Sequence, residues 1–143
     1  MTEPTRVAFV CVRNAGRSQM ATAFAERELA ARNLESEVAI VTGGTDPAEH
    51  VHDVVAEAMA EISIDIADRR PREITREGLS ACDYVITMGC SAADVCPATW
   101  SGENRDWELD DPGERPLESV RPIRDEIEHR VAELFDELQP GES

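Results

Sequence analysis

The sequence predicts a single α/β domain, a three-layer sandwich in which helices cover a four-stranded parallel sheet. Short apolar runs rich in β-branched residues alternate with longer segments whose apolar residues recur at helical spacing. This alternation requires crossover connections between parallel strands, which are right-handed. No internal repeat or linker interrupts the 143 residues, so we expect one domain over 1–143, with about 139–143 as a flexible tail.

Four strands are expected, three of them buried and one short. Residues 6–11, 37–42 and 83–88 read RVAFVC, EVAIVT and DYVITM. Near-continuous apolar runs of this kind are typical of parallel strands that are covered on both faces. A fourth, shorter strand is expected near 105–109, completing the sheet.

Three helices are expected between and after these strands. Residues 18–32 are rich in alanine, which lets a helix pack closely on a sheet. Residues 47–61 and 118–138 repeat apolar side chains every three or four positions, so each helix has one apolar face. The polar segments 67–78 and 91–116 contain Pro or Gly and are expected to be surface loops.

The charge of the chain is extreme, with 30 acidic against 14 basic residues and a formal net charge of −16. All the basic residues are arginine. An acidic, lysine-free composition is typical of halophilic proteins, because molar salt shortens the Debye length to about 3 Å and screens the repulsion. The charge disfavours nucleic acid or an anionic membrane as a partner. The lack of lysine excludes a Schiff base and a lysine-dependent nucleotide loop.

We expect a cytoplasmic protein. The N-terminus is polar rather than signal-like, and no run approaches the roughly 20 apolar residues of a membrane-spanning helix. We expect no metal site either, because the three histidines have no evident partner and no short Cys-x2-Cys spacing occurs.

Cys11 ends the first expected strand, and residues 12–17 lead from it into a helix. Ligands of open α/β sheets bind at the carboxyl ends of the strands, and the amides and dipole of a helix N-terminus favour an anion there. The Cys-x5-Arg spacing lets Arg17 return beside the thiol, where its guanidinium suits a tetrahedral oxyanion. Ser18 can donate a hydrogen bond to the sulfur, and Asn14 can hold a left-handed turn.

These features favour a thiolate at Cys11, so we predict a nucleophile rather than a packed core cysteine. The predicted anion site is the loop and the first turn of the helix, comprising Val12, Arg13, Asn14, Ala15, Gly16, Arg17 and Ser18.

The loop CVRNAGRSQMA resembles the phosphate loop of the low-molecular-weight tyrosine phosphatase superfamily, and its SQMA run is similar to the form in the arsenate reductase branch. Two further segments carry the resemblance over nearly the whole chain. Residues 83–97, DYVITMGCSAADVCP, are similar to the reductase segment with two resolving cysteines. Residues 106–114, DWELDDPGE, are similar to the family's Asp-Pro loop. The resemblance implies a low-molecular-weight phosphatase-like fold and an arsenate reductase.

The resemblance also implies a disulfide relay. Cys11 attacks arsenate held by the loop amides and Arg17, while Asp111 acts as general acid on the departing oxygen. Cys90 then displaces arsenite and forms a disulfide with Cys11, and Cys96 moves that disulfide to the surface. Thioredoxin or another thiol reductant would reduce it there, and no resident cofactor is implied. The order of Cys90 and Cys96 stays open.

Other functions remain open at this point. A phosphatase that hydrolyses phosphate monoesters through a phosphocysteine needs only Cys11, Arg17 and Asp111. Against it, Gly113 and Glu114 stand where phosphatases of the family usually have aromatic residues, which favours a small inorganic oxyanion such as arsenate, with phosphate or sulfate as analogues. A non-catalytic oxyanion or redox sensor is the alternative of another class.

Two further positions carry expectations of their own. Arg13 stands where the family usually has glycine, so its side chain is either a second cation near the anion or a solvated group. Cys82 precedes the third expected strand and is expected to be a packed, inert thiol.

Overall fold

The computed structural model describes residues 4–88, 102–110, 112–113 and 115–138. Its centre is a parallel sheet with strand order β2-β1-β3-β4, as the alternation of strands and helices predicts. The strands are β1 (Thr5–Cys11), β2 (Val38–Gly44), β3 (Tyr84–Met88) and β4 (Glu103–Asp106).

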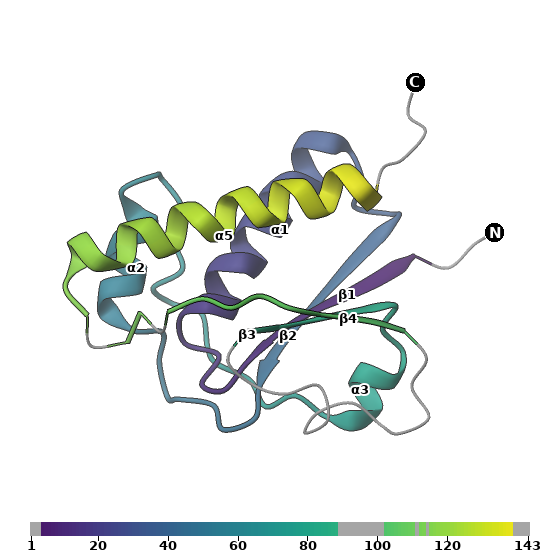
Figure 1. The fold of residues 1–143 in the computed structure, drawn as a ribbon, viewed down its shortest axis with the longest axis horizontal. Helices are drawn as coiled ribbons and strands as arrows, with labels where there is room; N and C mark the ends of the chain where they lie inside the picture. Colours follow the sequence, from purple (N-terminus) through teal and green to yellow (C-terminus); the bar gives the residue numbers. More distant parts are fainter. Residues whose placement is uncertain (1–3, 89–101, 111, 114, 139–143) are drawn as a thin grey trace.

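Helices cover both faces of this sheet (Figure 1). The helices α1 (Arg17–Arg32), α2 (Asp53–Ala60) and α5 (Leu117–Leu138) lie on one face, and the short α3 (Arg76–Ser80) lies on the other. Side chains alternate along β1, so Val7, Phe9 and Cys11 pack toward the three helices, while Ala8 and Val10 pack toward α3. The three-layer α/β prediction is therefore confirmed.

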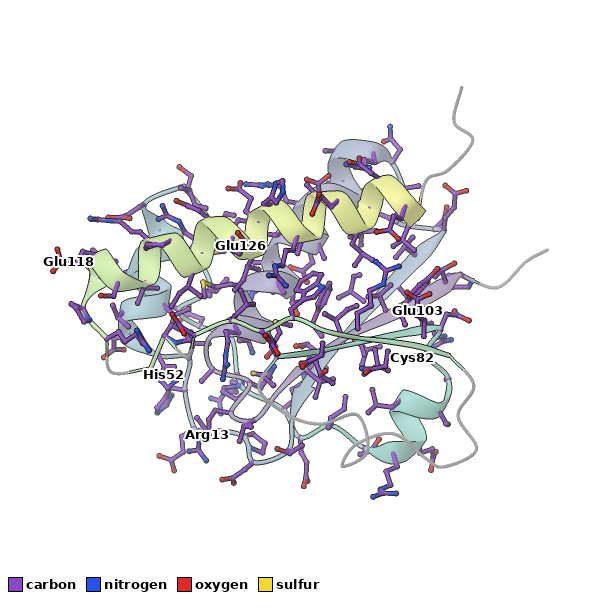
Figure 2. All side chains as sticks on the ribbon, viewed as in Figure 1. Arg13, His52, Cys82, Glu103, Glu118 and Glu126 are labelled. Atoms are coloured by element: carbon purple, nitrogen blue, oxygen red, sulfur yellow. The ribbon has the colours of Figure 1, made fainter. Side chains whose placement is uncertain are left out.

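The longest helix, α5, has the apolar stripe that its spacing predicts. Its buried apolar residues contact the core, and they are Val120, Ile123, Ile127, Val131, Leu134 and Phe135. Charged side chains occupy the opposite face, as Glu126 shows in Figure 2. In the part of the chain that the structure describes, neither α5 nor any other helix has the length and apolar character to cross a membrane.

Two expectations about helices were wrong. The helix expected over 47–61 begins only at Asp53, because the backbone of residues 45–52 instead donates hydrogen bonds to the loop after β1. Within the segment expected to be a loop over 67–78, the helix α3 begins at Arg76, with Thr75 accepting a hydrogen bond from the Gly78 N–H as its N-cap. Long-range hydrogen bonds explain the late start of α2, and an N-cap explains the start of α3.

The register of the strands positions the functional loop. Cys11 is paired with Gly44 at the end of β2 and with Met88 at the end of β3. The carboxyl ends of three neighbouring strands therefore meet at one edge of the sheet, with Cys11 in the middle.

Candidate active site

The loop between β1 and α1 turns its carbonyl groups toward residues 45–52. Four carbonyl oxygens of the loop accept hydrogen bonds of 2.8 to 3.3 Å from backbone N–H groups of that segment. The donor and acceptor pairs are Thr45 to Cys11, Asp46 to Val12, Ala48 to Arg13 and His52 to Ala15. The described peptide bonds are trans, so the N–H that follows each of these carbonyls points the opposite way. These N–H groups belong to Val12, Arg13, Asn14 and Gly16.

The Asn14 N–H shows where that opposite side lies, because it donates to Cys11 Sγ at 3.2 Å. Among the described residues, the backbone N–H groups of Arg13 and Gly16 donate to no acceptor. Backbone N–H groups beside a helix N-terminus bind anions. The loop can therefore hold an oxyanion next to the thiol.

Asn14 holds the loop in this conformation. It has a positive φ of 52°, in the left-handed region that asparagine tolerates better than most residues, and its side chain is fully buried. Its side-chain oxygen accepts from the Arg72 backbone N–H at 2.9 Å and from Gln19 Nε2 at 3.1 Å. Its nitrogen donates to Ser18 Oγ at 2.7 Å and to Thr42 Oγ1 at 2.9 Å. The full hydrogen-bonding capacity of the amide is used.

These contacts leave the Ser18 hydrogen available for the hydrogen bond between Ser18 and Cys11. The Arg72 N–H can only donate, so Asn14 turns its oxygen toward Arg72 and its nitrogen toward Ser18. Since Ser18 Oγ accepts from Asn14, its own hydrogen is available to Cys11 Sγ at 2.8 Å. Cys11 is only 2% exposed, and its sulfur meets both the Asn14 N–H and the Ser18 hydroxyl.

Arg17 and the loop that contains Pro112 lie beside this cradle. Arg17 Nη1 donates to the Leu109 carbonyl at 3.0 Å. A Cβ placed on Gly16 would lie 2.8 Å from Pro112 Cγ, so Pro112 packs directly on the loop after β1. Asp111 itself lies outside the described residues. Leu109 and Pro112, which precede and follow it in the chain, both contact the loop.

Comparison with known proteins decides the family. The model of the low molecular weight phosphotyrosine protein phosphatase family matches residues 6–142. The chain belongs to this family. It is 54% identical over 138 residues to a protein of the halophile Halobacterium salinarum named "Putative arsenate reductase", covering 96% of each chain. It is 36% identical to an arsenate reductase of Halalkalibacterium halodurans, covering 86% of this chain and 89% of that one. Within the family, the chain thus groups with the arsenate reductases.

Solved structures agree with this placement. A thioredoxin-dependent arsenate reductase of Corynebacterium glutamicum has a TM-score of 0.75 at 36% identity; the match covers 96% of this chain but only 63% of that one. A structure described as an arsenate reductase in the phosphate binding state has a TM-score of 0.76 at 31% identity, covering 93% and 98%. A low molecular weight phosphotyrosine phosphatase of Vibrio cholerae, with a TM-score of 0.82 at 19% identity, supports the fold alone. The predicted family and fold are confirmed.

The structure describes two of the four cysteines of this family member. Cys11 and Cys82 lie on opposite faces of the sheet. Cys82 is 4% exposed and packs with Leu79 beneath the sheet, as predicted, and its inertness stays a prediction. Cys90 and Cys96 lie outside the described residues, so their predicted roles are proposals.

The Arg13 side chain belongs to the rim of the loop. Its Nη1 donates to Asp46 Oδ2 at 2.7 Å, in a pair whose side chains are 47% and 76% exposed. Figure 2 shows Arg13 at the edge of the molecule. Of the two expectations for this side chain, the contacts favour the solvated group, because an exposed pair of this kind contributes little binding energy. Its backbone N–H still faces the anion side.

His52 is the rim residue that the sequence did not reveal. Its ring carbon Cδ2 would lie 3.4 Å from a Cβ on Gly16, and Figure 2 shows it at the same end of the molecule as Arg13. The placement depends on the irregular 45–52 segment, so no local sequence signal indicates it. Within the described residues, no three His, Cys, Asp or Glu side chains gather as a metal site requires.

Proposed function

We propose that the chain is an arsenate reductase that uses Cys11 as its nucleophile. The observation that carries the proposal is the arrangement at the sulfur, where the Asn14 N–H and the Ser18 hydroxyl both point at Cys11 beneath the outward-facing loop amides. The names of relatives at 54% and 36% identity support arsenate as the substrate. The similar reductase described in a phosphate binding state supports a tetrahedral oxyanion as the ligand of this loop.

In the first step, the Cys11 thiolate attacks arsenic and forms a sulfur–arsenic bond. Amides of the loop and the Arg17 guanidinium hold the oxygens of arsenate and balance the charge that develops on them. Asp111 protonates the hydroxyl group that leaves, so that it departs as water. The contacts of Leu109 with Arg17 and of Pro112 with Gly16 support this role, because they hold the chain on both sides of Asp111 against the loop.

In the second step, the Cys90 thiolate attacks Cys11 Sγ and a disulfide forms between them. The sulfur–arsenic bond breaks, and its electron pair stays with arsenic, which is thereby reduced and leaves as arsenite. Support comes from the register, because Met88 is paired with Cys11 and Cys90 follows Met88 by two residues. Cys96 then attacks Cys90 and releases Cys11. A dithiol reductant such as thioredoxin regenerates the two cysteines, as the name of one similar reductase suggests.

A phosphatase is the second candidate, because attack on a phosphate monoester needs the same cysteine and arginine. The aromatic side chain nearest to the Asp-Pro pair in the sequence argues against it. Trp107 is 7% exposed and packs on Phe9, with ring centroids 5.9 Å apart, so it does not form a wall for an aryl substrate.

Activity assays in molar KCl separate these candidates. Arsenate reduction coupled to thioredoxin and hydrolysis of an aryl phosphate are measured on wild type and on Cys11→Ser, Cys90→Ser and Cys96→Ser. We expect reduction in wild type and its loss in all three variants. The control Cys82→Ser, which changes a buried thiol on the opposite face of the sheet, should retain reduction.

Other outcomes overturn the proposal. Hydrolysis that survives in the Cys90 and Cys96 variants, with no reduction in wild type, would indicate a phosphatase. Absence of both activities from folded wild type would leave the oxyanion or redox sensor. Reduction that survives in Cys96→Ser with thioredoxin would eliminate the outward transfer of the disulfide.

A further inference from the structure

A pocket of about 410 Å³ lies behind the loop after β1, between α1, β2 and the segment that precedes α3. This volume falls within the range of small-molecule sites, roughly 300–1,000 Å³. Arg69, Arg70 and Arg72 line it together with Gln19 and Thr42, while Cys11 and Arg17 do not. The pocket is therefore separate from the site at the thiol.

The charge of this pocket is opposite to that of the molecule. Three arginines and one carboxylate, Glu26, give its lining a formal charge of +2 in a chain of −16. Arg69 Nη2 pairs with Glu26 at 2.6 Å. Among the described residues, no carboxylate pairs with Arg70 or Arg72, although acidic residues outnumber basic ones by 30 to 14. Guanidinium groups gathered in a concave site repel cations and suit oxyanions.

The pocket also contacts the network that holds Cys11. Three of the four hydrogen bonds of the Asn14 side chain go to residues of the pocket lining, namely Gln19, Thr42 and the backbone N–H of Arg72. The fourth goes to Ser18, whose hydroxyl meets the sulfur. A ligand that moves Arg72 or Gln19 therefore acts on Cys11 through two side chains.

We propose that this pocket is a second anion site, which binds a phosphate-class oxyanion and changes the reactivity of Cys11 through Asn14 and Ser18. The Arg70 and Arg72 guanidinium groups supply the positive charge, and the neighbouring amide and hydroxyl side chains supply polar contacts. The anion is either free or part of a small organic phosphate. The site does not depend on arsenate being the substrate at Cys11.

Calorimetric titration with inorganic phosphate, in constant molar KCl, tests the binding. Wild type should bind two phosphate ions, one in each site. Arg17→Gln should retain the pocket site, and the double variant Arg70→Gln/Arg72→Gln should retain only the site at the thiol. Arg76→Gln removes an exposed arginine outside the pocket and should bind as wild type does. One bound phosphate in wild type, unchanged in the double variant, overturns the proposal.

A second titration of Arg17→Gln uses adenosine monophosphate as the probe. Tighter binding than inorganic phosphate identifies a small organic phosphate as the ligand class, and equal or weaker binding identifies the free oxyanion. If Arg17→Gln does not fold, crystals of the wild type are soaked in selenate instead. The proposal then requires an anomalous selenium signal beside Arg70 and Arg72.

The coupling between the pocket and Cys11 is measured on Arg17→Gln as the rate at which iodoacetamide alkylates Cys11. Peptide mass spectrometry monitors this rate. Allosteric coupling free energies commonly correspond to about 5-fold or more, so phosphate should change the rate by about that factor. The Arg70→Gln/Arg72→Gln substitutions added to Arg17→Gln should remove the effect. A constant rate while phosphate is bound would overturn the coupling.

Discussion

The state of Cys11 depends on hydrogen bonds whose direction is set one residue further away. Ser18 can donate to the sulfur because Asn14 donates to Ser18, and Asn14 is oriented by the Arg72 N–H. Every group in this chain of contacts is buried or backbone, so water cannot replace a missing donor easily. Removing one donor therefore costs more than a surface hydrogen bond would.

The first prediction concerns Ser18→Ala. The substitution removes a donor from the sulfur and leaves the Asn14 Nδ2 group without its shortest contact. A hydrogen bond to a charged group contributes about 1.5–3 kcal/mol, so we expect alkylation of Cys11 at neutral pH to slow by roughly 10- to 100-fold. Peptide mass spectrometry measures the rate. Ser18→Thr retains the hydroxyl and should stay within a few-fold of wild type; equal rates in all three proteins would disprove the role.

The second prediction concerns Gly44, at the end of β2. A Cβ there would lie 2.5 Å from the Val12 carbonyl oxygen and 3.0 Å from the Asn14 nitrogen, and both are backbone atoms that cannot rotate away. Gly44→Ala should destabilise the fold by about 1–3 kcal/mol, the cost of overpacking, and displace the anion loop. Denaturant unfolding and phosphate affinity measure the two effects.

A matched substitution at Gly78 provides the control. An added Cβ at that position meets only the side-chain oxygen of Thr75, at 3.0 Å. Gly78→Ala should leave phosphate affinity unchanged. Unaltered phosphate affinity in Gly44→Ala would show that the close approach of β2 does not shape the loop.

At this scale, sequence reasoning finds residues whose role is local. Cys11, Arg17, Ser18 and Asn14 were predicted because a strand end, a Cys-x5-Arg spacing and a helix start lie within eight residues. His52, Gly44 and Arg72 lie 30 to 58 residues from Asn14 in the sequence. No pattern in their own neighbourhood indicates those contacts. The predicted roles of Asp111, Cys90 and Cys96 stay predictions.

At the scale of elements, α5 is bound to α2 by one carboxylate and two arginines. Arg124 Nη1 donates to the Ala58 carbonyl at 2.8 Å and to Glu61 Oε1 at 2.9 Å, and Arg121 Nε donates to the same carboxylate oxygen at 3.0 Å. The hydrogen bonds from Arg121, followed by those from Arg124, lower the pKa of Glu61 from 4.5 to about 2. These contacts hold the C-terminal end of α2 on α5.

The third prediction follows from the sign of this shift. A carboxyl whose pKa is lower in the folded protein adds stability above pH 4.5, and that stability is lost as the pH falls toward about 2. Glu61→Gln should therefore lower the urea midpoint at pH 6, and the difference from wild type should shrink between pH 4.5 and 2. Arg121→Gln should likewise lower the urea midpoint more at pH 6 than near pH 2. A difference that stays constant with pH would contradict this account.

The elements show why a periodic pattern alone misplaces a helix start. Val51, Val54, Val55 and Ala58 have helical spacing, and Val51 is buried, yet the helix begins at Asp53. Four backbone N–H groups within residues 45–52 donate to loop carbonyls instead of forming a first helical turn. The anion loop and the late start of α2 are thus two results of the same hydrogen bonds.

At the scale of the whole molecule, two opposing effects of charge bear on stability. Ion pairs cover much of the arginine surface; for example, Arg105 binds Glu137 and Glu103, and Arg32 binds Glu28 and Asp136. Exposed pairs contribute about 0–1 kcal/mol each, and salt weakens them. The excess of 16 negative charges acts in the opposite sense, because its repulsion destabilises the compact state and is removed by salt.

The last prediction compares these two effects. Raising KCl from 0.1 M to 1 M shortens the Debye length from about 10 Å to about 3 Å, which screens repulsion between distant charges more than attraction within close pairs. The unfolding temperature should therefore rise with KCl. The variant Glu35→Gln/Glu108→Gln removes two exposed charges that lie outside the helices. This variant should unfold at a higher temperature than wild type in 0.1 M KCl and gain less from added salt. Calorimetric scans of both proteins measure the unfolding temperature at each KCl concentration. Equal salt dependence in the two proteins would contradict the view that salt stabilises the fold by screening repulsion.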